Sequence, residues 1–193
     1  MRTKVFWTGL VLATLLLCAC GPIIGGMMTA GNGIGDFRVT SGNLETLRRG
    51  GKLAVIGPFD KTPEAFYICR GEDEAHFVSV FKQTGLFAAE LGVPDRFPKQ
   101  LPKIADWRGK SGAEIQQAFK LTAAPEFLLS GTILKRDMIT VPAQGVVTNV
   151  AYRLDFLEIA TGKTTTIEVQ VKELFQDAIP TIVRELARKM GRS

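Results

Sequence analysis

Residues 148–171 read Thr-Asn-Val-Ala-Tyr-Arg-Leu-Asp-Phe-Leu-Glu-Ile-Ala-Thr-Gly-Lys-Thr-Thr-Thr-Ile-Glu-Val-Gln-Val. Apolar and polar side chains alternate through residues 148–158 and again from Thr164 to Val171, which is the period of strands with one buried face. Ala160-Thr-Gly-Lys163 between them is typical of a hairpin turn with glycine at the left-handed position. This stretch therefore predicts an antiparallel hairpin, and with it a sheet.

The segments on either side of the hairpin complete a fold prediction. Residues 127–134 read as a strand containing a glycine, and apolar residues from Phe175 to Met190 recur at helical spacing. Ser111-Gly-Ala-Glu114 forms a capping box, which predicts the start of a helix. Further upstream, the pattern indicates strands at 53–56 and 86–89, a helix after three carboxylates at 72–74, and a long loop over 92–110. We expect an α+β fold: a single mixed β-sheet with helices packed on one face, over residues 52–193.

Three of these segments carry a resemblance to a known family. They are Ala118–Thr132, Tyr152–Lys163 and the closing amphipathic helix. Together they resemble the envelope lipoprotein domains that share the fold of the TolB amino-terminal domain, a group that includes CsgG, PelC and LpoB. The resemblance covers roughly Lys52 to Met190. It implies the TolB-like α+β fold and a role in the bacterial envelope, and because some members of the group form rings, it implies a candidate homo-oligomer.

The amino terminus has the pattern of a lipoprotein signal peptide. Arg2 and Lys4 precede thirteen largely apolar residues, 5–17, fewer than the roughly 20 that a membrane-spanning helix needs. Leu17-Cys18-Ala19-Cys20 then resembles a bacterial lipobox. We expect a signal peptide at residues 1–19 and lipidation (palmitate) on Cys20, which would anchor the chain in a membrane. An uncleaved anchor or an ordinary secretory signal cut after Ala19 are the alternatives.

The residues that follow Cys20 bear on its location. Nine glycines between 21 and 51 predict a flexible lipidated tether over residues 20–51. Gly21 follows the lipidated cysteine where an aspartate commonly retains lipoproteins in the inner membrane, so the resemblance favours the outer membrane, on its periplasmic face. Of 24 basic residues, two lie in the signal, leaving a mild excess over 19 acidic ones, and nucleic acid is not an expected partner.

Residues suited to catalysis are few. His76 is the sole histidine, and a lone histidine on a helix is more often a partly buried structural residue than a base or metal ligand. Cys69 has no cysteine partner within the mature chain, and there is no Cys/His cluster for zinc. We expect no enzyme activity, no cofactor and no metal site. Trp107 and Phe97, in the proline-rich loop, are candidate partner contacts, although Trp107 equally suits a cap on the domain's own core.

These features lead to two functional hypotheses. The first is a non-enzymatic lipoprotein of the outer membrane, acting as an accessory or assembly component of an envelope export or secretion complex. The alternative is an LpoB-like regulator of a peptidoglycan-synthesising enzyme, which needs a tether long enough to reach through the periplasm. The identity of the envelope protein partner is open in both.

Overall fold

The computed structural model describes residues 32–65, 72–94, 103–141 and 145–192. Its strands are β1 (Gly33–Ser41), β2 (Lys52–Ile56), β3 (Asp60–Lys61), β4 (Ala88–Gly92), β5 (Phe127–Val141), β6 (Gly145–Glu158) and β7 (Thr164–Leu174). Its α-helices are α2 (Glu45–Arg48), α3 (Asp73–Thr84), α4 (Gly112–Phe119) and α5 (Ala178–Lys189), and short 3₁₀ turns are η1 (Pro63–Ala65) and η2 (Ile104–Trp107).

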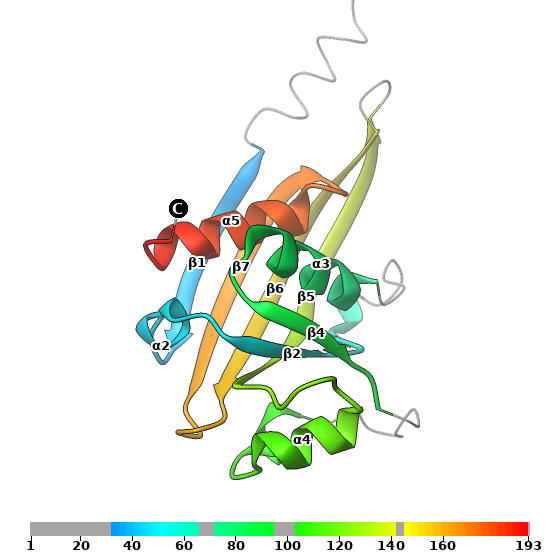
Figure 1. The fold of residues 1–193 in the computed structure, drawn as a ribbon. Coiled ribbons are helices and arrows are strands. Elements are labelled where there is room, and N and C mark those ends of the chain that lie inside the picture. The colour runs from blue at the N-terminus through cyan, green and yellow to red at the C-terminus, as the bar shows by residue number, and fades with distance from the viewer. Residues whose placement is uncertain (1–31, 66–71, 95–102, 142–144, 193) are drawn as a thin grey trace, which may run out of the picture.

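These strands form one mixed sheet in the order β1-β7-β6-β5-β2-β4, with β3 paired to β5 (Figure 1). Pairing is antiparallel from β1 to β5, whereas β2 runs parallel to both β4 and β5. The predicted α+β class with a single mixed sheet is confirmed. The predicted hairpin is confirmed as β6 and β7, which pair from Val147↔Leu174 to Leu157↔Thr164.

The main core lies between the sheet and two helices, α3 and α5. Phe77 and Phe81 of α3, with Ile182 and Leu186 of α5, are all at most 1% exposed. They pack on the inward side chains of β6 and β7, as alternation predicts: Val150, Tyr152, Leu154, Phe156, Ile167, Val169 and Val171. This packing positions α3 beside the edge strand β4.

Helix α4 packs on the opposite face of the sheet, a position that the sequence prediction did not include. Its Ile115 and Phe119 form a second, smaller cluster with Ala54 of β2 and Leu128 of β5. The predicted capping box is confirmed: the Glu114 amide donates to Ser111 Oγ at 3.2 Å, and the Ser111 amide donates to the Glu114 carboxylate at 2.8 Å. These bonds from Ser111, together with nearby Lys110, hold the pKa of Glu114 below its usual value.

Two expectations need correction. Glycine content predicted a tether through residue 51, but Gly33–Ser41 forms strand β1, paired with β7, and Glu45–Arg48 forms helix α2. Glycine weakens a strand, but here the edge of β7 supplies the hydrogen bonds, and a register shift lies at Ile34/Asp36, next to Gly35. Phe175, expected on the buried face of the last helix, instead precedes α5 and is 44% exposed.

Candidate functional site

Strand β4 leaves one side of its backbone open. The Ala88 amide donates to the Gly51 carbonyl at 2.9 Å, and the Gly57 amide donates to the Gly92 carbonyl at 3.0 Å. In a parallel ladder, alternate residues face the same neighbour, so the peptide groups of Ala89 and Leu91 point away from β2. Since β4 ends the strand order, these groups form an open edge that can pair with an added strand.

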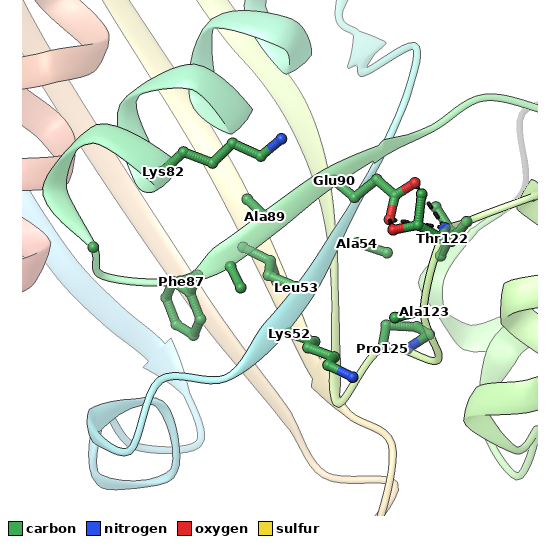
Figure 2. A pocket seen from close by; sticks show the side chains of 13 residues that line it. Lys52, Leu53, Ala54, Lys82, Phe87, Ala89, Glu90, Thr122, Ala123 and Pro125 are labelled. Atoms are coloured by element: carbon green, nitrogen blue, oxygen red, sulfur yellow. Dashed lines mark hydrogen bonds between the residues drawn. The ribbon is translucent and has the colours of Figure 1, made fainter.

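A groove of about 650 Å³ runs beside this edge (Figure 2). The carboxyl end of α3 and the segment between α4 and β5 contribute its two sides, and β2 and β4 lie between them. Its lining is mostly apolar, with two lysines, one glutamate and one threonine: Lys52, Leu53, Ala54, Lys82, Gly85, Phe87, Ala88, Ala89, Glu90, Leu121, Thr122, Ala123 and Pro125. A largely apolar groove with a few polar groups is typical of a binding site.

One side of the groove is held in place by Glu90. Its carboxylate accepts hydrogen bonds from the Thr122 amide, at 2.9 and 3.0 Å, and from the Thr122 hydroxyl at 2.8 Å. Figure 2 shows this contact joining β4 to the segment that follows α4. Because charge-assisted hydrogen bonds are stronger than neutral ones, the contact fixes the width of the groove at this end.

The groove also carries an excess of positive charge. Lys82 extends from α3, and Lys52 begins β2 (Figure 2). No ion pair joins either ammonium group to a carboxylate within the described ranges. The Glu90 carboxylate keeps its charge while it accepts from Thr122, so two lysines and one glutamate give the lining a net charge of one positive unit. An extended segment carrying carboxylates complements this arrangement.

A second polar cluster is buried under the amino end of α3. Arg136 Nη2 of β5 lies 2.6 Å from the Asp73 carboxylate, and the two side chains are only 4% and 9% exposed. Arg136 also donates to the Tyr152 hydroxyl on β6. This cluster connects α3 to two strands, and its burial makes it a structural feature of the fold rather than a surface for ligands.

The predicted site residues are not brought together by the structure. Cys20 and Phe97 lie outside the described residues. Trp107 ends η2 and packs on Phe119 with ring centroids 4.7 Å apart, partly buried beside the α4 cluster. Trp107 therefore caps the domain's own core, and its role as a partner contact stays a prediction. His76 is half-buried on α3.

The groove residues escaped sequence reasoning because no local signal marks them. Lys82 and Glu90 look like ordinary surface charges, and an edge strand has the same pattern as an internal one. In the described part of the chain, no group of three or more His, Cys, Asp or Glu side chains is placed to hold a metal ion. Over the same residues, no helix combines the length and apolar character needed to cross a membrane.

No protein-family model matches the chain, and no curated protein matches it. Among solved structures, the PelC dodecamer from Paraburkholderia phytofirmans is similar at 16% identity and a TM-score of 0.47, over 80% of this chain and 96% of that one. A substituted form of the same PelC dodecamer gives 15% identity, a TM-score of 0.47, and coverage of 81% and 98%. A hypothetical protein from Chlamydia trachomatis gives 10% identity, a TM-score of 0.37, and coverage of 74% and 94%. At these identities and scores, the fold class rests on this chain's own strand order.

Proposed function

We propose that this protein is a non-enzymatic, lipid-anchored component of the outer membrane that faces the periplasm and docks other envelope proteins. In this role it serves an export or secretion complex as an accessory or assembly component. The anchor rests on the Leu17-Cys18-Ala19-Cys20 sequence. The docking role rests on one structural observation, the groove beside the open edge of β4.

The groove supports docking of an extended segment by strand addition. The Ala89 and Leu91 peptide groups supply backbone hydrogen bonds, and the accessible side chains of Ala88 and Ala123 supply apolar contact. Lys52 and Lys82 favour a segment that carries acidic side chains. The segment belongs either to another envelope protein or to a second copy of this chain, because sheet-edge contacts also generate homo-oligomers.

The length of chain before the sheet weighs against the alternative, regulation of a peptidoglycan synthase. Strand β1 begins at Gly33, so eleven residues separate Cys20 from the first described residue, Asn32. The stretch from Cys20 to Asn32 spans at most about 40 Å when fully extended. A tether of this length keeps the domain close to its membrane, which suits an outer-membrane assembly better than a partner across the periplasm.

Photo-crosslinking from the groove in intact cells tests the docking role. A photoreactive amino acid at Lys82, which lines the groove, is expected to yield a crosslinked product of defined mass. The matched control is Gln83, the next residue of α3, which is exposed and does not line the groove.

The mass and identity of the product distinguish the versions of the proposal. A product of twice the monomer mass indicates self-association, and one containing an export or secretion component indicates the accessory role. Recovery of a peptidoglycan synthase would favour the alternative function. Equal products from positions 82 and 83, or none from either, would show that the groove is not a docking site.

A further inference from the structure

Two exposed apolar side chains lie near one end of the long hairpin formed by β5 and β6, on opposite faces of the sheet. Ile139 is 53% exposed and Phe175 is 44% exposed. Ile139 and Leu174 both pair with Val147, and the Phe175 amide donates to the Val146 carbonyl at 2.8 Å. We name the four residues Ile139, Val146, Leu174 and Phe175 the arm end. A hollow of about 220 Å³ lies beside Val146, Leu174 and Phe175.

The arm end projects beyond the point where the chain enters the sheet. Gly33, the first residue of β1, pairs with Lys172 of β7. Lys172 pairs with Asn149 of β6, and Asn149 pairs with Asp137 of β5, so these four residues lie at one level of the sheet. Ile139 and Leu174 lie two residues beyond that level, and β5 and β6 stay paired for four residues, to Val141↔Gly145. At a rise of about 3.3 Å per residue, these arm-end residues project about 7 Å and the hairpin about 13 Å. Figure 1 shows the start of β1 and the tips of β5 and β6 at the same end of the molecule.

The length of the preceding chain sets how far this end lies from the lipid anchor. Between Cys20 and Asn32 there are eleven residues, four of them glycine. Fully extended, a chain of this length reaches at most about 40 Å. An anchor on Cys20 would therefore hold the membrane within that distance of Asn32, at the end of the sheet where the arm end lies.

We propose that the arm end inserts into the lipid interface of the membrane that holds the Cys20 anchor. This inference rests on the proposed lipidation, which places the membrane next to this end. Isoleucine and phenylalanine partition into the interfacial region, and a second attachment point beside a lipid anchor limits the orientations of the domain. The domain then stands with its hairpin toward the lipid and its α4 end away from it (Figure 1).

Depth-dependent fluorescence quenching tests the proposal on the full lipidated protein. A bimane label is attached at Ile139→Cys, Phe175→Cys or Leu91→Cys in a Cys69→Ser background, and the protein is placed in vesicles of phosphatidylethanolamine and phosphatidylglycerol. Leu91 is the matched control because it is an exposed apolar side chain on the distant edge strand β4. Nitroxide on the lipid acyl chain near the headgroup is expected to quench labels 139 and 175 at least twofold, with label 91 unchanged.

Two further measurements separate the outcomes. Phe175→Asp is expected to lower quenching of the 139 label towards that of the 91 label, with the melting temperature unchanged. Metabolic labelling with palmitate reports the anchor independently, so absence of label defeats the proposed function itself. With palmitate present, equal quenching at 139 and 91 overturns the arm-end proposal. Quenching of label 139 by a nitroxide-labelled second copy, without quenching by the lipid nitroxide, overturns it in favour of a protein interface.

Discussion

Side-chain packing, and not backbone conformation, accounts for the glycine at position 131. It lies in β5 with ordinary strand geometry, and a Cβ atom there would clash with Cδ2 and Cε2 of the Phe59 ring. Phe59 is 2% exposed and packs on Phe77 with centroids 5.7 Å apart. The glycine noted in this strand from the sequence therefore leaves the space that the buried Phe59 ring occupies.

Replacing this glycine is expected to destabilise the domain. Gly131→Ala forces the Phe59 ring out of its place, which costs about 1–3 kcal/mol for an overpacked core site. Gly35→Ala in β1 is the control, because the nearest atom to a Cβ there is the Gln170 carbonyl oxygen at 3.8 Å. Urea unfolding followed by circular dichroism measures both. Equal losses for the two variants would show that strand propensity, and not the ring, sets the requirement for glycine.

At the scale of elements, the Asp73–Arg136 pair fixes where α3 lies on the sheet. Acidic residues at 72–74 were predicted to favour a helix start, and α3 does begin at Asp73. The structure adds that two of these residues are buried: Asp73 pairs with Arg136, and Glu74 accepts a hydrogen bond from the Phe59 amide. The local signal was correct for the helix, but it carried no information about the strand that supplies the arginine.

Removing one partner of this pair is expected to cost more than removing both. Asp73→Ala leaves a buried guanidinium without its carboxylate and should lower the free energy of unfolding by about 3–5 kcal/mol. The double variant Asp73→Ala with Arg136→Met should lose less than this single variant. The control is Asp137→Ala, whose partner Lys135 lies 3.1 Å away with both side chains about half exposed, and a loss below about 1 kcal/mol is expected. Urea unfolding at neutral pH distinguishes them, and additive losses in the double variant would argue against coupling.

At the scale of the whole molecule, the sheet has two unlike edges. The β1 edge carries register shifts at Ile34/Asp36 and Val39/Ser41 and an Asp36–Arg38 ion pair at 2.7 Å, features that discourage pairing with another strand. The β4 edge is regular, has the groove beside it and is followed by exposed Val93. This asymmetry makes β4 the edge at which we expect association.

The proposed lipid on Cys20 attaches the whole molecule to the membrane, and the Cys20→Ala variant tests this attachment. The substitution removes the proposed acyl acceptor, while Cys18 follows Leu16-Leu17 and lacks a small residue before it. The variant precursor is expected to stay uncleaved, without palmitate label, and with the same unfolding midpoint in its domain, because the sheet begins only at Gly33. Radioactive palmitate labelling reports lipidation, and the mobility of the protein on a gel reports cleavage of the precursor. Equal label on the wild type and the variant, or label lost only in Cys69→Ala, would contradict the assigned anchor.

Features whose signals are local could be predicted from the sequence. Alternation marked β6 and β7, helical spacing marked α5, and the Ser111–Glu114 box marked the start of α4, because each pattern is complete within one segment. The Cys20 anchor is likewise a prediction from sequence alone. Tertiary structure alone decided which strands became edges, that Gly33–Ser41 pairs with β7, and that Phe175 stays outside the core. It also brought Lys82, Glu90 and Thr122 around one groove. These outcomes depend on which distant segment supplies hydrogen bonds or covers a side chain, and no local pattern encodes the partner.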